Sequence, residues 1–201
     1  MISGVDERIY SARKIAKENG IPVIRDKSFE LLLTTACAKQ PKKILEIGAA
    51  WGYSGIALLN VCNGAHLTTM EIDDDCIKHS RQNYIEFGVN DRVTLFTGDA
   101  SEIIPLLSGE FDFIYLDGPK GHYYEFLPHL LNVLTKGGVL FADNVLFNGY
   151  VTGERVPTSK NKHNTIINSL RNYLKAITSD ENLVSTVLDI EDGVAITVKK
   201  N

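Results

Sequence analysis

Two acidic signals stand where apolar stretches of the chain end, and their residue types suit metal chemistry. Asp117 follows one apolar run and precedes Gly-Pro-Lys120, and Asp143-Asn144 closes another. Together they supply two carboxylates and one carboxamide. Mg²⁺ prefers oxygen ligands in octahedral coordination and keeps positions open for water or substrate. The pattern therefore predicts a divalent-cation site, although each acid could instead only cap the turn that follows it.

Three earlier strand ends carry residues that suit a nucleoside. The first runs from Glu46 through Gly48 to Gly52 and Ser54, and its glycines would let the backbone approach a ligand closely. Glu71, nineteen residues after Gly52, stands where a carboxylate would hold a ribose diol. The next strand ends in Gly98-Asp99-Ala100, where Asp99 could accept from an adenine amino group and Ala100 would let the ring lie close. Turn glycines that serve packing, and acids that cap helices, are the alternative interpretation.

A repeated change from short apolar runs to helical periodicity indicates a parallel sheet that positions these residues. Strands are predicted at 43–47, 66–72, 93–97, 111–116 and 138–142. Helices are predicted at 54–62, 74–87, 101–107, 123–134 and 164–177. Ligands of such sheets bind at the carboxyl ends of the strands, which is where the acids lie.

The N-terminal part, residues 1–40, is predicted to be helical on either side of Ile21-Pro22-Val23-Ile24. That stretch must be extended, because proline disfavours helix in the residue before it. The expected buried face of the first helix consists of Ile9, Ala12, Ile15 and Ala16. This amphipathic helix could pack on its own sheet or pair with a second subunit in a homodimer.

The C-terminal part departs from the alternation of strands and helices. Residues 184–190 and 194–199 are predicted to be strands joined through Asp192-Gly193, a strong hairpin signal. The expected fold is therefore α/β, with a doubly wound, mostly parallel seven-stranded sheet, a C-terminal antiparallel hairpin and N-terminal helices. No domain boundary is evident, so residues 1–201 are predicted to form a single domain.

Length and composition are those of an ordinary globular protein. The chain has 201 residues, 44% of them hydrophobic and 23% charged, which is enough for a core without disulfides. A net charge of −4 argues against binding nucleic acid or membrane by bulk charge. Three cysteines without a CxxC pair fit a reducing compartment. With no run of 18 apolar residues and no hydrophobic N-terminal segment, we expect a cytoplasmic protein without a membrane partner.

The sequence lacks the motifs of several other enzyme classes. There is no Gly-Lys-Ser/Thr phosphate loop, no GxSxG nucleophile turn and no HExxH zinc pattern. The glycine spacing is GxxxGxxG, which differs from the GxGxxG of dinucleotide enzymes and argues against a nicotinamide-dependent dehydrogenase. A non-catalytic module that binds a nucleoside or RNA remains an alternative. It would have no use for the predicted metal ligands.

Taken together, the motifs resemble the cation-dependent O-methyltransferases, a family that includes the catechol and caffeoyl-CoA enzymes. The resemblance runs from about Ile21 to the last strand. It rests on the set of motifs Glu46-x-Gly48-x3-Gly52-Tyr53-Ser54, Glu71, Gly98-Asp99-Ala100, Asp117-x2-Lys120 and Asp143-Asn144. It implies a class I methyltransferase sheet, Rossmann-like, that binds S-adenosylmethionine together with Mg²⁺ or another divalent cation.

The resemblance also implies a role for each matching residue. Glu46, Gly48, Ser54 and the backbone near Ile24 would hold the methionine end, Glu71 the ribose, and Asp99 and Ala100 the adenine. Asp117, Asp143 and Asn144 would ligate the metal, Asp117 would border both sites, and Lys120 would be the general base. A lysine beside a cation has a lowered pKa and can accept the proton of a metal-bound hydroxyl.

Two differences from the catechol enzymes bear on the identity of the methyl acceptor. Their substrate-binding glutamate is replaced by the stretch 184–187, and their tryptophan gate by Gly118-Pro119. The segments 143–149 and 191–196 look most like a bacterial branch that includes the tRNA 5-hydroxyuridine methyltransferase. A tRNA anticodon is the favoured partner and a small phenolic acceptor the alternative. Basic residues after Asn144 could contact phosphates or simply be solvated: Arg155, Lys160, Lys162, His163, Arg171 and Lys175.

Overall fold

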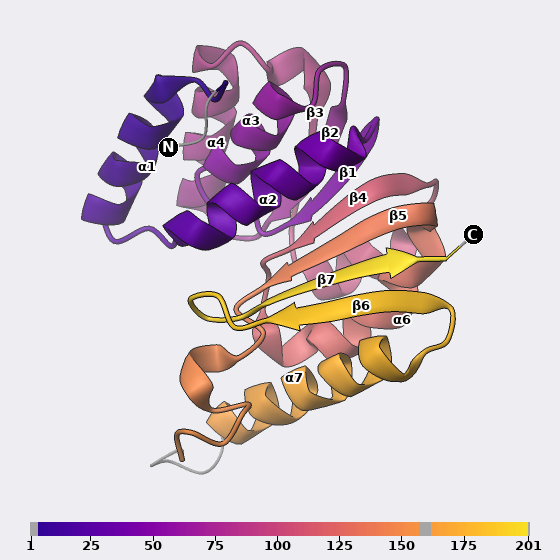
Figure 1. Cartoon of the computed structure of the whole chain (residues 1–201). Helices are drawn as coiled ribbons and strands as arrows, with labels where there is room; N and C mark the ends of the chain where they lie inside the picture. Colours follow the sequence, from indigo (N-terminus) through magenta and orange to yellow (C-terminus); the bar gives the residue numbers. More distant parts are fainter. Residues whose placement is uncertain (1–3, 157–161, 201) are drawn as a thin grey trace.

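Seven strands form one sheet in the order β3-β2-β1-β4-β5-β7-β6 in the computed structural model, which describes residues 4–156 and 162–200 (Figure 1). The first five strands are mutually parallel, and β7 lies antiparallel to both β5 and β6. The strands are β1 (Lys43–Ile47), β2 (His66–Glu71), β3 (Val93–Thr97), β4 (Phe111–Leu116), β5 (Leu134–Asp143), β6 (Leu183–Leu188) and β7 (Val194–Lys199). The predicted architecture is confirmed.

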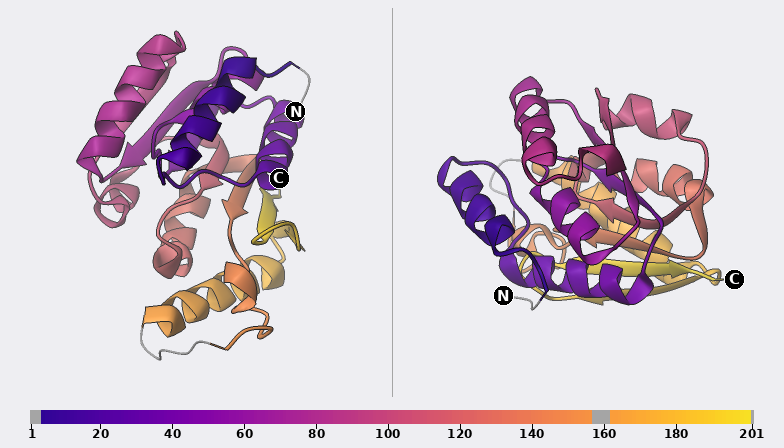
Figure 2. Two further views of the ribbon diagram at one scale, coloured as in Figure 1. Left: turned by 90° about the vertical axis from the view of Figure 1, so that its left-hand side faces the viewer. Right: turned by 90° about the horizontal axis from the view of Figure 1, so that it is seen from above.

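Helices cover both faces of the sheet (Figure 2). The helices are α1 (Glu7–Glu18), α2 (Asp26–Lys39), α3 (Tyr53–Val61), α4 (Asp74–Glu86), α5 (Ala100–Ile103), α6 (Tyr123–Val133) and α7 (Lys162–Ser179). Alternate residues of a strand point to opposite faces, so Ile44 packs in the core with α1, α2 and α3, whereas Leu45 packs in the core with α6 and α7. Burial on both faces explains why the parallel strands read as short apolar runs.

Two predicted elements have different bounds in the structure. The helix expected at 101–107 splits into α5 and the 3₁₀ turn Ile104–Leu106. Pro105 has no backbone N–H to donate, so it cannot continue the α-helical hydrogen-bond pattern. Strand β5 begins at Leu134 instead of Gly138, because Leu134 already pairs with Phe111 of β4.

The predicted buried face of α1 is partly wrong. Ile9 and Ala16 are buried as expected, but Ile15 is 54% exposed and Arg13 is only 5% exposed. The guanidinium of Arg13 lies 3.6 Å from the ring centroid of Phe29, and its Nη2 donates to the Ile24 carbonyl at 2.5 Å. A cation–π contact and a backbone acceptor therefore keep the charged Arg13 buried, while Ile15, which the pattern placed inside, is exposed.

The C-terminal strands pair as predicted, but their connection, residues 189–193, is longer than a two-residue turn. This loop holds the segment after β5 in place. The amides of Val145 and Leu146 donate to the carbonyls of Gly193 and Asp192 at 3.0 and 2.9 Å. The amide of Asn148 donates to the Asp192 carboxylate. The strand pair thus fixes the chain immediately after Asn144.

Two further sequence expectations concern membranes and cysteines. Within the described ranges, no helix combines the length and apolarity needed to cross a bilayer. Cys37, Cys62 and Cys76 are free thiols, so no disulfide joins them.

Candidate functional site

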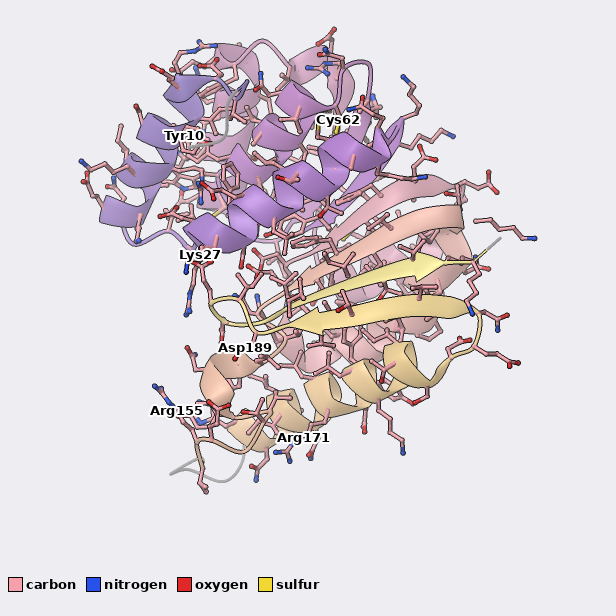
Figure 3. All side chains as sticks on the ribbon, in the orientation of Figure 1. Tyr10, Lys27, Cys62, Arg155, Arg171 and Asp189 are labelled. Carbon is pink, nitrogen blue, oxygen red and sulfur yellow. The ribbon has the colours of Figure 1, made fainter. Side chains whose placement is uncertain are left out.

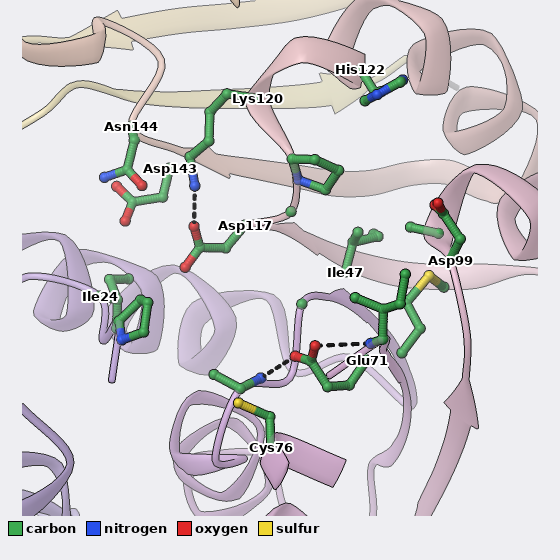
Figure 4. Close-up of a pocket in the computed structure, with 18 of the residues that line it drawn as sticks. Ile24, Ile47, Glu71, Cys76, Asp99, Asp117, Lys120, His122, Asp143 and Asn144 are labelled. Atoms are coloured by element: carbon green, nitrogen blue, oxygen red, sulfur yellow. Dashed lines mark hydrogen bonds and ion pairs between the residues drawn. The ribbon is translucent and has the colours of Figure 1, made fainter. Parts of the chain in front are cut away.

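A cavity of about 690 Å³ opens at the carboxyl ends of β1 to β5 (Figure 4). It lies where the strand order reverses between β1 and β4, the usual ligand position of doubly wound sheets. Nine of the eleven predicted site residues line it: Ile24, Gly48, Glu71, Asp99, Ala100, Asp117, Lys120, Asp143 and Asn144. The fold therefore brings together residues that are up to 120 positions apart in the sequence.

The two remaining residues, Glu46 and Ser54, lie beside this cavity. Glu46 on β1 is fully buried, and its carboxylate accepts hydrogen bonds from Ser54 Oγ at 2.6 Å and Thr69 Oγ1 at 2.7 Å. Burial raises the pKa of Glu46 to about 7, and the hydroxyl donors only partly offset this. Ser54 belongs to the first turn of α3 and lines a smaller adjoining cavity. Through its hydrogen bond with Ser54, Glu46 therefore links β1 to the first turn of α3.

Glycine is required in that turn by close contacts. Gly48 has φ +94°, and a Cβ there would lie 2.7 Å from the Asp117 carbonyl oxygen. Gly52 has φ +85°, and a Cβ there would lie 2.7 Å from the ring of Tyr84. Both conformations are strained for any other residue. Gly48 thus lets the β1–α3 turn approach the end of β4, and Gly52 lets it approach Tyr84 of α4.

Glu71 shapes the cavity with both of its carboxylate oxygens. Oε2 accepts from the Ala50 amide at 2.7 Å, and Oε1 accepts from the amides of Ile72 and Asp73 at 2.8 and 3.0 Å. A carboxylate offers about four acceptor positions, so about one remains for a ligand hydroxyl. Glu71 therefore fixes the β1–α3 turn as well as facing the cavity.

Asp99 and Ala100 both line the cavity, where Asp99 lies far from Asp143 and Asn144 (Figure 4). Asp99 is also the N-cap of α5, where its Oδ1 accepts from the Ser101 amide at 2.8 Å. The capping interpretation therefore holds for Asp99 and is compatible with its place in the cavity wall. Asp73 caps α4 in the same way through the Cys76 amide.

Asp117 is held between a lysine and a tyrosine. Lys120 Nζ lies 2.8 Å from Asp117 Oδ1, and the buried Tyr115 hydroxyl donates to Oδ2 at 2.9 Å. Both side chains of the ion pair are about one-quarter exposed or less, so solvent still reaches them. Lys120 thus lies beside a carboxylate and faces the cavity (Figure 4).

Asp143 is a buried acid whose carboxylate lacks hydrogen-bond donors. It is 1% exposed, and neither carboxylate oxygen has a hydrogen-bond partner among the described residues. Burial, followed by repulsion from Asp117, raises the pKa of Asp143 to about 7. An unpaired buried carboxylate costs free energy unless a cation compensates it. Its neighbour Asn144 has φ +58°, so the backbone turns sharply after Asp143.

This arrangement fits a divalent cation. Across the described residues, no group of three or more His, Cys, Asp and Glu side chains is poised to hold a metal. The predicted set is different, since it combines two carboxylates, Asp117 and Asp143, with the Asn144 carboxamide. Such oxygen donors suit a hard cation that keeps open positions. A cation bound here would give the orphaned oxygens of Asp143 the partner that they lack.

Two tyrosines that the sequence reasoning missed position these acids. Tyr123 donates its hydroxyl to the carbonyls of Leu116 and Asp143 at 3.0 and 3.2 Å, which ties the ends of β4 and β5 together. Tyr115 supports Asp117 directly. Both are fully buried, and a buried hydroxyl requires a partner. For Tyr115 a signal was available, because a residue two positions before the strand-end Asp117 lies on the same face of the strand.

The predicted basic group after Asn144 is only partly described. Arg155 and Lys175 are exposed, whereas Lys160 and the side chain of Lys162 lie outside the described residues. Arg171 donates to the carbonyls of Val151 and Tyr150 at 3.0 and 3.3 Å, so it fastens the loop to α7 (Figure 3). His122 lines the cavity and pairs with Glu125 at 2.8 Å.

Comparison with known proteins adds the following similarities. A sequence model described as O-methyltransferase matches residues 8–200. A catechol O-methyltransferase of Niastella koreensis is 28% identical over 209 residues, which cover 97% of this chain and 91% of that protein. The O-methyltransferase of Bacillus cereus, solved with S-adenosylhomocysteine (SAH), has a TM-score of 0.86 at 23% identity, with coverages of 100% and 94%. An SAH-bound methyltransferase of Podospora anserina has a TM-score of 0.75 at 25% identity, with coverages of 100% and 99%.

Proposed function

The chain belongs to the O-methyltransferase family, and on that premise we propose that it transfers the methyl group of S-adenosylmethionine to a metal-chelated hydroxyl group. The observation that carries the metal-dependent part is the Asp143 carboxylate, which is buried beside Asp117 without a hydrogen-bond partner in the described chain. A cation bound there would compensate both acids.

The cofactor would lie along the row of strand ends. Asp99 and Ala100 would face its adenine and Glu71 its ribose, while Gly48 and the Ile24 backbone would border the methionine part. Asp117 lines both the main cavity and the smaller one beside Ser54, so it would border the reacting sulfonium. Support for this ligand comes from the match to the family and from the SAH-bound relative.

Asp117, Asp143 and Asn144 would hold the divalent cation. When bound, such a cation lowers the pKa of a coordinated hydroxyl and fixes its direction. Lys120 Nζ, now 2.8 Å from Asp117 Oδ1, would accept the proton of the acceptor hydroxyl as its neutral amine. The activation barrier would be lowered further because the site would hold the acceptor oxygen close to the methyl group and in line with it.

The favoured acceptor is 5-hydroxyuridine at the wobble position of tRNA. Its hydroxyl stands next to a ring carbonyl, so the two oxygens could chelate a cation as a catechol does. Gly118 and Pro119, neither of which has a long side chain, form the part of the cavity wall that precedes Lys120. A small catechol-like or phenolic acceptor is the second candidate, and the catechol O-methyltransferase among the relatives supports it.

The cofactor and the metal are tested by calorimetry and by activity in parallel. The wild type should bind SAH and not NAD⁺, and activity should disappear with EDTA and return with Mg²⁺. Asp143→Ala should abolish methylation and leave SAH affinity unchanged, because Asp143 would contact the metal and not the nucleoside. An equal loss of SAH affinity in Asp143→Ala and Glu71→Ala would contradict this separation of the two sites.

The acceptor is tested with hydroxyuridine-containing tRNA and with a trihydroxybenzene, followed by mass spectrometry of the nucleosides. Replacing Arg155, Lys160 and Lys162 together by Ala should weaken tRNA methylation, flatten its salt dependence and leave the small acceptor unaffected. Equal losses on both acceptors would assign the loop a structural role. Failure of the wild type to methylate the tRNA would favour the phenolic acceptor, and SAH binding without methylation of any hydroxyl would favour a binding module.

A further inference from the structure

Arg13 of α1 is a buried cation whose surroundings do not satisfy it. Its side chain is 6% exposed, with the guanidinium over the ring of Phe29 and Nη2 on the carbonyl of Ile24. Its Nε is buried and has no hydrogen-bond partner within the described parts of the chain. Burial of a charged group is costly unless an opposite charge and further hydrogen bonds compensate it.

The carboxylate that contacts Arg13 offers little compensation. Asp26 Oδ1 lies 3.4 Å from Nη2, and the Asp26 side chain is 86% exposed. A contact of that length to a solvated acid is weak. The Phe29 ring and the Ile24 carbonyl hold the guanidinium in place, whereas its charge is met by the solvated Asp26 carboxylate at 3.4 Å.

A small cavity of about 30 Å³ lies against Arg13. Its remaining wall is formed mainly by the β1–α3 turn and by the segment before α2. It shares Pro22, Val23, Ile24, Gly48, Ala50 and Asp117 with the wall of the 690 Å³ cavity, so it adjoins that cavity at the proposed methionine end. Arg13, Tyr53 and Ser54 line only the smaller of these two cavities.

The wall opposite the 22–24 segment is also electropositive. Helix α3 begins there at Tyr53 and Ser54, and its N-cap Gly52 provides no side-chain acceptor for the first-turn amides. The N-terminus of a nine-residue helix carries a partial positive charge and unpaired N–H donors. A buried guanidinium and a helix N-terminus thus face one small space, and this combination suits a carboxylate.

We infer that Arg13 binds the carboxylate of the methionine part of the cofactor, opposite the first turn of α3. The inference rests on the proposed function, because it places S-adenosylmethionine in the main cavity. With the nucleoside at Glu71 and Asp99, the amino-acid tail extends past Gly48 toward Ser54. The carboxylate is the only anionic group of this cofactor, so it is the group that a cation at the end of the tail selects. Helix α1 is then a wall of the cofactor site.

The test compares two ligands that differ in the tail. SAH carries the amino acid, whereas 5′-methylthioadenosine has the same nucleoside and sulfur without the carboxylate. Their affinities for the wild type, Arg13→Met, Arg13→Lys and Lys14→Met are measured by calorimetry in the presence of Mg²⁺. Lys14 is the matched control, because it is the next residue of α1 and its side chain is 78% exposed. Thermal unfolding without ligand verifies that each variant is folded.

Arg13→Met should weaken SAH binding about tenfold to a hundredfold, as expected for the loss of a charge-assisted hydrogen bond. It should leave methylthioadenosine affinity unchanged, and Lys14→Met should change neither. Arg13→Lys keeps the charge and most of the stem, so it should fold and show a smaller, equally selective loss. Equal losses on both ligands, or an unchanged SAH affinity, would overturn the inference and leave the proposed function intact. A wild type that binds neither ligand would overturn both.

Discussion

Replacing Glu46 by Gln should make the unfolding free energy of the protein less sensitive to pH. Glu46 is fully buried under the β1–α3 turn, and its pKa rises from 4.5 to about 7, first because of burial. Gln keeps the shape, and its carbonyl oxygen can accept from one of the two hydroxyls of Ser54 and Thr69, while its NH₂ group can donate to the other. The substitution therefore removes the titration and preserves most of the packing.

The sign follows from proton linkage. Between pH 4.5 and about 7 the folded protein holds a proton on Glu46 that the unfolded chain has lost. Stability from this group is therefore fully present below pH 4.5 and is lost as the pH rises through about 7. Each pKa unit corresponds to about 1.4 kcal/mol, so the complete effect is roughly 3 kcal/mol. Between pH 5 and pH 8 the wild type should lose about 2–3 kcal/mol relative to Glu46→Gln.

Urea unfolding of the ligand-free protein at pH 5, 6, 7 and 8 measures this difference, with circular dichroism as the probe. Glu102→Gln is the control, because it removes one negative charge from an exposed carboxyl. Titration of Asp143 and other groups cancels when each variant is subtracted from the wild type at the same pH. Parallel stability curves for the wild type and Glu46→Gln would refute the reasoning, since they would mean that Glu46 is charged throughout.

Three further substitutions probe how the site is held. Tyr123→Phe removes the donor that joins the carbonyls at the ends of β4 and β5, and urea unfolding should show a loss of about 1–3 kcal/mol. Gly52→Ala places a Cβ 2.7 Å from the Tyr84 ring at φ +85°, so a loss of at least about 1 kcal/mol in the same assay is expected. Glu71→Gln should reduce SAH affinity about tenfold or more in calorimetry, since a charge-assisted acceptor is lost; an unchanged affinity would place the ribose elsewhere.

The sheet could be predicted because its strands carry two independent signals. Each parallel strand is a short apolar run, and most end in an acid or glycine that begins a turn. Since the carboxyl ends of parallel strands share one edge, placing the strands was enough to bring Glu71, Asp117 and Asp143 together. The cavity lining confirms that juxtaposition, whereas the roles of the residues remain predictions.

The supporting residues could not be predicted because their partners are distant in the sequence. Tyr123 bonds to carbonyls of two strands, and Arg13 packs on Phe29 of another helix. Hydrophobic periodicity treats Arg13 as polar and Ile15 as apolar, so it predicts that Ile15 is buried. The wrong assignment arose because Arg13 is held by the Phe29 ring and the Ile24 carbonyl, and hydrophobic patterning carries no signal for such contacts.

Three carboxyl groups lie close to one another at one edge of the sheet, on Glu46, Asp117 and Asp143. Their mutual repulsion disfavours the charged form of each buried acid. Asp117 contributes to the raised pKa of both Glu46 and Asp143, although burial is the larger cause in each. The proposed ligands bring positive charge to the same edge, as a sulfonium, an ammonium and a divalent cation. Binding should therefore relieve a repulsion that the ligand-free fold sustains. Amides at these positions would stabilise the protein and weaken its selection of cations, which is the usual opposition between stability and function.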